Sequence, residues 1–119
     1  MDKQTVRLLV NFTVNDGQLE EFTSVAQAMT AASQAESGTL GYEWFASANG
    51  KHYRLLETYV DAAAVEAHFM GLALKLVPKI AATCSVDLLE VYGDPGPKVV
   101  DMVGGFGGLV YGYQLGLDR

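Results

Sequence analysis

Three polar residues stand in mostly apolar stretches of this 119-residue sequence, and their side chains could carry chemistry: Asn11, Glu57 and His68. A carboxylate among aromatic residues either accepts a hydrogen bond from a nearby hydroxyl or amide, or keeps its proton. A buried amide needs hydrogen-bond partners, which a cavity holding water or a polar ligand would provide. Each residue therefore has a structural interpretation, as a satisfied core group, and a functional one, in binding or proton transfer.

Sequence patterns assign the first two of these residues to strands. Residues 6–14, 39–45, 51–60 and 85–92 are rich in β-branched and aromatic side chains, which predicts four strands. Apolar residues recur every three or four positions from Leu19 to Met29, which predicts a helix that ends before Gly38. The segment Asn15-Asp16-Gly17 is expected to supply the N-cap of that helix.

A second helix is predicted to carry His68. Asp61 is its expected N-cap, and Gly71 and Pro78 predict that it breaks and restarts before residue 83. The same periodicity gives this helix an apolar stripe, which comprises Val65, His68, Phe69 and Leu72.

The order of the predicted elements is β-α-β-β-α-β, the ferredoxin-like arrangement of the α+β class. It gives a four-stranded antiparallel sheet with both helices on one face and the other face bare. We expect residues 1–93 to form this domain. We expect the regular structure to end near Asp94-Pro95-Gly96-Pro97, and the Gly-rich extension of residues 94–119 to pack on the same domain or on a partner subunit.

The hairpin register predicts the surroundings of Glu57. Asn49-Gly50 is a favoured two-residue turn, and such a turn makes the numbers of paired residues sum to 99. Tyr42 then lies opposite Glu57, Trp44 opposite Leu55, and Leu40 opposite Tyr59. This side is almost wholly aromatic and aliphatic, and a Glu57–Tyr42 hydrogen bond is the structural interpretation of the carboxylate. The apolar stripe that carries His68 should face it.

Composition excludes several functions. The net charge is −6, the pI is near 4.7, and no basic run occurs, which argues against nucleic acid and anionic membrane surfaces as partners. The lone Cys84 permits no intrachain disulfide, and we expect a cytoplasmic protein without a signal peptide or membrane span. With only 18% charged residues, the chain is expected to hide surface against a second copy. No metal-ligand motif is apparent.

The segments "EFTSVAQAMTAASQAESGTLGYEWF" and "LLETYVDAAAVEAHF" resemble the antibiotic biosynthesis monooxygenase family, over roughly residues 5–93. Members share a Glu-x-Gly turn, a Tyr on the second strand, Glu-x-aromatic closing the third strand, and alanines followed by a histidine on the second helix. The corresponding residues here are Glu36, Gly38, Tyr42, Glu57, Tyr59, Ala64, Ala67 and His68.

The resemblance implies a homodimer whose two sheets form an α/β barrel, with a pocket between each sheet and its helices. Some members oxygenate phenolic or hydroquinone-like aromatics with O2 and no cofactor. The haem-degrading members are similar in having an Asn on the first strand, matched here by Asn11. They also have a Trp where this chain has His68, and a later histidine that this chain lacks. We therefore expect no cofactor and no metal.

The resemblance leads to the hypothesis of a cofactor-independent monooxygenase acting on a phenolic or hydroquinone-like aromatic. His68 would be the base, with Glu57 as second candidate, and Asn11 would bind the substrate oxygen or a peroxide. Tyr42, Trp44 and Tyr59 would form an aromatic wall against a flat ring. The alternatives are a dimer of the same fold that binds a small aromatic ligand without turnover, and a purely structural dimer.

Overall fold

The structure is a computed structural model that describes residues 3–119, apart from the side chains of residues 72–74. Residues 1 and 2 of the predicted domain, and the position of the Leu72 side chain on the predicted stripe, therefore lie outside the described residues. The strands are β1 (Val6–Val14), β2 (Thr39–Ala46), β3 (His52–Tyr59), β4 (Cys84–Tyr92) and β5 (Leu109–Tyr111). They form one sheet in the order β2-β3-β1-β4-β5, in which only β5 pairs parallel to its neighbour.

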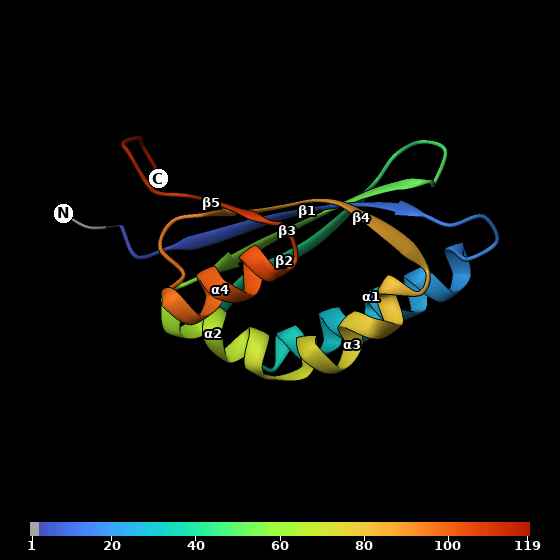
Figure 1. The fold of residues 1–119 in the computed structure, drawn as a ribbon, viewed down its shortest axis with the longest axis horizontal. Helices are drawn as coiled ribbons and strands as arrows, with labels where there is room; N and C mark the ends of the chain where they lie inside the picture. The colour runs from blue at the N-terminus through green and yellow to red at the C-terminus, as the bar shows by residue number, and fades with distance from the viewer. Residues whose placement is uncertain (1–2) are drawn as a thin grey trace.

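The helices α1 (Leu19–Gln34), α2 (Ala62–Met70), α3 (Leu72–Ala81) and α4 (Pro97–Gly105) all lie on one face of this sheet (Figure 1). Side chains alternate along β1, where Val6, Leu8, Val10, Phe12 and Val14 are buried beneath the helices. The α+β, ferredoxin-like prediction is confirmed. We call the opposite side of the sheet, which no described helix covers, the outer face.

The hairpin of β2 and β3 keeps most of the predicted register. Tyr42 pairs with Glu57 and Trp44 with Leu55, as the sum of 99 requires. Ser47 N–H donates to the carbonyl of His52, so the turn is a four-residue loop rather than a two-residue one. A register shift between Thr39 and Gly41 leaves Thr39, and not Leu40, opposite Tyr59. The predicted Leu40–Tyr59 pair is therefore wrong.

The second predicted helix breaks where Gly71 indicated. α2 ends at Met70 and α3 begins at Leu72. Asp61 is the N-cap of α2, since its side chain accepts a hydrogen bond of 2.9 Å from Ala64 N–H. The predicted N-cap of α1 within Asn15-Asp16-Gly17 is wrong. Gln18 is the residue before the helix and its side chain makes no capping hydrogen bond, while residues 15–18 form a turn closed by backbone groups.

The Pro- and Gly-rich segment predicted that the regular structure ends near residue 94. This prediction is wrong, because α4 and β5 follow that segment. The first N–H groups of a helix have no intrahelical acceptor, so proline, which lacks an N–H, loses no hydrogen bond at the first position. Pro97 starts α4 in this way. Val99 and Val103 of α4 are fully buried against Val6, Val65 and Val91. The chain then adds β5 to the edge of the sheet, so a helix and a strand extend the predicted four-stranded arrangement.

Candidate functional site

His68 occupies the centre of a buried polar cluster between the sheet and α2. Only 4% of its surface is exposed. Its Nδ1 atom lies 2.8 Å from Oε1 of Glu36, and its Nε2 atom lies 3.7 Å from Oε1 of Glu57. The first distance is a hydrogen bond and the second is too long for one. The rings of Tyr42 and Tyr59 lie 5.6 and 5.3 Å from the imidazole, between centroids.

Glu36 reaches His68 from the turn between α1 and β2. The backbone N–H of Thr39 donates to the carbonyl of Glu36, which closes the turn, and the Thr39 hydroxyl donates to the Glu36 carboxylate at 2.7 Å. One carboxylate oxygen therefore receives both the Thr39 hydroxyl and the His68 ring. Glu36 was part of the family resemblance, but sequence reasoning assigned it no role in the site. The sequence feature that could have indicated its role is the short Glu-x-Gly spacing, which places a carboxylate at a tight turn.

Glu57 is a buried carboxyl group whose hydrogen bond comes from its own strand. The Tyr59 hydroxyl donates to Glu57 Oε1 at 2.5 Å, because residues two apart on a strand share a face. The hydrogen bond expected from Tyr42 is thus replaced by one from Tyr59. Burial raises the pKa of Glu57 above its ordinary value of 4.5, while the neighbouring His68 and the Tyr59 hydroxyl act in the opposite direction.

Tyr42 and Tyr59 are hydrogen-bond donors rather than bases at neutral pH. Burial raises the pKa of both phenols well above their ordinary value of 10, and the nearby Glu57 carboxylate raises it further. A phenolate beside a carboxylate in a low-dielectric site would be doubly unfavourable. The imidazole of His68 and the carboxyl groups of Glu36 and Glu57 therefore remain the proton acceptors of this cluster.

A water-sized cavity adjoins His68 on the side of α1. Its volume is about 10 Å³, close to the minimum that holds one water molecule. A groove of about 460 Å³ on the surface between α1 and β2 shares Ser33 and Tyr42 with this cavity. The Tyr42 side chain therefore belongs to both the inner cavity and the outer groove. The cavity is lined by Met29, Ala32, Ser33, Glu36, Tyr42, His68 and Leu76.

Trp44 lies further along β2 and does not line that cavity. Its indole Nε1 donates to Thr30 Oγ1 of α1 at 2.9 Å, and its ring stacks on Phe12 at 5.5 Å between centroids. It packs against Phe22 edge-on and lines a second groove of about 370 Å³ with Tyr53. Trp44 thus joins the hairpin to α1 and to the core. It lies two residues along β2 from Tyr42, the residue that pairs with Glu57.

Asn11 is not part of the site, and its predicted place beside His68 is wrong. Its neighbours Val10 and Phe12 face the helices, so the Asn11 side chain points to the outer face of the sheet. It lies in register with Arg54 of β3 and Leu88 of β4. Its Oδ1 atom is buried and has no hydrogen-bond partner among the described residues.

The described residues contain no group of three or more His, Cys, Asp and Glu side chains that could hold a metal ion. Nor does any helix among them have the length and apolar character needed to cross a membrane. The cluster itself offers acid–base groups: an imidazole, two carboxyl groups and two phenols. The arrangement can therefore take a proton from a bound molecule and hold the resulting charge.

The fold and the site define a ferredoxin-like α+β domain with a buried acid–base cluster between sheet and helices. The chain belongs to the antibiotic biosynthesis monooxygenase family, whose model matches residues 5–73, more than half of its length. No curated protein matches it significantly.

Several solved structures share the fold. MupZ from Pseudomonas fluorescens is 21% identical with a TM-score of 0.81, and the alignment covers 98% of this chain and 95% of MupZ. A conserved protein from Bacteroides thetaiotaomicron is 26% identical with a TM-score of 0.68, over 75% and 96% of the two chains. SnoaB from Streptomyces nogalater, a cofactor-independent oxygenase, is 17% identical with a TM-score of 0.67, over 79% and 96%. The high coverage by MupZ includes most of the segment after residue 93.

Proposed function

We propose that this protein is a cofactor-independent monooxygenase that oxidises a phenolic or hydroquinone-like aromatic with O2. Family membership and the fold shared with SnoaB support the reaction class. The observation that carries the proposal is the burial of His68 between Glu36 and Glu57, beside a cavity that Tyr42 separates from a surface groove.

The proposed reaction needs a base before it needs an oxidant. His68 Nε2 takes the phenolic proton, and the electron-rich phenolate gives one electron to O2. Recombination at a ring carbon that bears hydrogen forms a C–O bond to a peroxide. Loss of that hydrogen as a proton, with cleavage of the O–O bond, releases water. A phenol and O2 thus give a p-quinone and water, one oxygen atom entering each product.

Glu57 is the second proton acceptor in this proposal, and Tyr59 holds its carboxyl group in place. Tyr42 is the inner wall of the substrate site. Trp44 is left out of the substrate wall, since its ring lines neither the cavity nor the groove of about 460 Å³ but the separate groove of about 370 Å³. Asn11 is left out, because it lies on the other face of the sheet.

The substrate ring is proposed to bind in the groove between α1 and β2. Its volume of about 460 Å³ is within the usual range of ligand pockets, whereas the inner cavity of about 10 Å³ holds no ring. Rotation of the Tyr42 side chain would join the two spaces and bring the phenol to His68. The small cavity also favours one alternative, a protein that binds an aromatic ligand in the groove without turnover.

Oxygen uptake with a panel of anthrones and hydroquinones tests the proposal. Turnover should be lost in His68→Ala and kept in His52→Ala, the matched control, since His52 is exposed on the outer face. Product formed under ¹⁸O2 should carry one labelled oxygen. Ligand binding without oxygen uptake would establish the non-catalytic alternative, and neither binding nor uptake would refute both.

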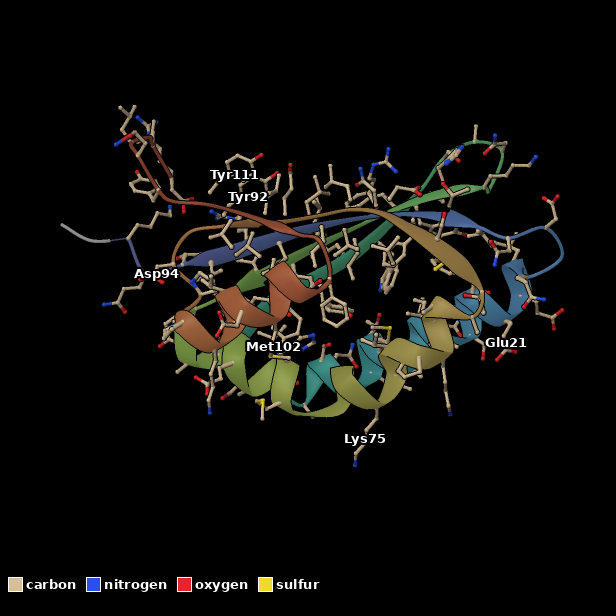
Figure 2. The ribbon with its side chains drawn as sticks, viewed as in Figure 1. Glu21, Lys75, Tyr92, Asp94, Met102 and Tyr111 are labelled. Atoms are coloured by element: carbon tan, nitrogen blue, oxygen red, sulfur yellow. The ribbon has the colours of Figure 1, made fainter. Side chains whose placement is uncertain are left out.

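A homodimer formed through the outer faces is part of the proposal. Phe45 and Leu56 on this face are 51% and 42% exposed, and Tyr92 stacks on Tyr111 there at 5.9 Å, both pointing away from the helices (Figure 2). A partner amide or hydroxyl could also satisfy the Oδ1 atom of Asn11. Together these features support a second copy packed sheet to sheet.

The end of the C-terminal extension is proposed to reach that second copy. Leu115 and Leu117 are 82% and 78% exposed, and the segment leaves the sheet on its outer side (Figure 1). Asp118 holds it there through ion pairs to Lys3 and Arg7. The cytoplasmic location stays a prediction.

Sedimentation analysis of Leu56→Arg tests the dimer. This variant should be monomeric at concentrations where the wild type is dimeric, because it places a charge in the proposed interface. Met70→Arg is the matched control, since Met70 is 57% exposed but lies on α2, away from the outer face. A dimeric Leu56→Arg protein would contradict this arrangement.

A further inference from the structure

We propose that Glu36 is a positioning residue that fixes the tautomer of His68. The close contact of Gly38 with Ala64 places the Glu36 carboxylate within hydrogen-bond distance of His68. In this role Glu36 keeps the proton of the neutral ring on Nδ1 and leaves Nε2 free to act on substrate. The catalytic consequence rests on the proposed function, in which His68 is the base. The tautomer and the contact that sets it do not depend on turnover.

The hydrogen bond between His68 and Glu36 sets the tautomer. A carboxylate accepts hydrogen bonds and cannot donate, so the ring nitrogen 2.8 Å from Glu36 Oε1 must carry the hydrogen. That nitrogen is Nδ1, and a neutral imidazole then has its lone pair on Nε2. The Thr39 hydroxyl donates to the same oxygen at 2.7 Å, which fixes the carboxylate against rotation.

Nε2 is directed at the buried carboxyl group of Glu57. It lies 3.7 Å from Oε1 of Glu57, beyond the range of a hydrogen bond. Glu57 is already engaged by the hydroxyl of Tyr59. When Nε2 takes a proton, the ring becomes a cation whose other N–H donates to a carboxylate, and such charge-assisted bonds are the stronger kind. Glu36 would therefore hold the ring in place before the transfer and stabilise its charge afterwards.

The Gly38–Ala64 contact explains how Glu36 comes to lie at His68. A Cβ atom built on Gly38 would lie 2.6 Å from the Cβ of Ala64, closer than real Cβ atoms approach one another. The turn therefore lies directly on α2, and only glycine permits it. The N–H of Val60 donates to the Gly38 carbonyl at 2.9 Å and ties the turn to the segment that leads into this helix.

The spacing of these residues follows from helix geometry. Ala64 and His68 are four residues apart, so they lie on the same face of α2, one turn from each other. Glu36 stands two residues before Gly38 in the turn that rests on Ala64. The contact at Ala64 thus sets the distance between the Glu36 side chain and His68, which lies one turn further along α2. Two separate sequence motifs, Glu-x-Gly and the alanine before the histidine, form one device.

Histidine tautomers measured by ¹⁵N NMR test this inference without substrate. Neutral His68 in the wild type should be protonated on Nδ1. In Glu36→Ala the signal should move to the Nε2–H form or to a mixture of both. The ring of His52, on the opposite face of the sheet, serves as an internal control in every spectrum and should not change. A wild-type His68 protonated on Nε2, or an unchanged tautomer in Glu36→Ala, would overturn the proposal.

A pair of compensating variants tests the contact and does not remove the carboxylate. Gly38→Ala should displace the turn and shift the His68 tautomer in the same direction as Glu36→Ala. Gly38→Ala combined with Ala64→Gly removes the clash and should restore the Nδ1–H form. Ala64→Gly alone should keep the wild-type tautomer. A double variant that stays shifted, while its thermal unfolding remains cooperative, would show that this contact does not position Glu36.

Kinetics adds a readout that a merely structural role would not move. With an active substrate, Glu36→Ala should lower kcat about 10-fold to 100-fold and leave KM nearly unchanged, a share of the contribution of a general base. Equal kcat values for variant and wild type would overturn the positioning role in catalysis. Absence of oxygen uptake by the wild type would refute the proposed function alone, since the tautomer results would still stand.

Discussion

The buried carboxyl group of Glu57 should give the stability of this protein a characteristic pH dependence. Burial raises the pKa of Glu57 above 4.5, and the hydrogen bond from Tyr59 and the proximity of His68 offset this only in part, while Glu36 adds to the rise. In the unfolded chain the same group returns to its ordinary value. Glu57→Gln keeps the shape and removes the titration, so it isolates this contribution.

The sign follows from proton binding in the two states. Between pH 4.5 and the folded pKa of Glu57, the folded protein keeps a proton that the unfolded chain has lost. The free energy of unfolding therefore falls as the pH rises through this window, with a limiting slope of about 1.4 kcal/mol per pH unit. Below the window and above it, Glu57 contributes no slope. The wild type should thus lose stability relative to Glu57→Gln as the pH rises.

Urea denaturation of both proteins from pH 4 to pH 9 measures this difference. Tyr59→Phe provides a second arm, because losing the hydroxyl should raise the pKa of Glu57 further and extend the window to higher pH. A difference between wild type and Glu57→Gln that is flat, or that grows in favour of the wild type with rising pH, would refute the reasoning. It would mean that Glu57 is solvated or more strongly paired than its burial implies.

Three further substitutions test the local structure around the site, each by chemical denaturation. Trp44→Phe should lower the free energy of unfolding by about 1 kcal/mol, because it removes the hydrogen bond to Thr30; an unchanged midpoint would contradict this bond. Asp61→Ala should cost about 1 kcal/mol through loss of the α2 N-cap, whereas Asp61→Asn should stay close to wild type; equal losses would argue against capping. Gly93→Ala should cost about 1–3 kcal/mol, since φ is +113° and its Cβ would meet the Thr5 carbonyl oxygen at 2.9 Å; a neutral result would refute the strain argument.

The hairpin and the helix stripe could be predicted from sequence because local rules decide them. Side chains alternate along a strand, so pairing Tyr42 with Glu57 fixes which residues share their face. The position of His68 on the apolar side of α2 follows from helical periodicity. The hydrogen bond from Tyr59 to Glu57 depends on side-chain rotamers and burial. The order of residue types along the strands could not distinguish it from a hydrogen bond from Tyr42 to Glu57.

Asn11 shows where the same reasoning fails. Its position between Val10 and Phe12 already places it on the opposite face of β1 from the core, by simple alternation. One alternating set of this strand is wholly apolar, whereas the other set, Arg7, Leu9, Asn11 and Thr13, is mostly polar. The Asn11 prediction failed because it treated the strand as apolar throughout, although this alternation was present in the sequence.

The extension after residue 93 could not be predicted because its glycines and prolines are typical of irregular chain. In the structure, Val99 and Val103 of α4 instead complete the core over β1 and β4, against Val65 of α2. The helix that carries His68 is therefore held at two places. The Gly38 turn contacts it at Ala64, and α4 packs beside it near Val65, so both the carboxylate and the helix behind the imidazole are fixed before any ligand binds. A proton acceptor that must be aimed to within a few tenths of an ångström benefits from such a rigid support.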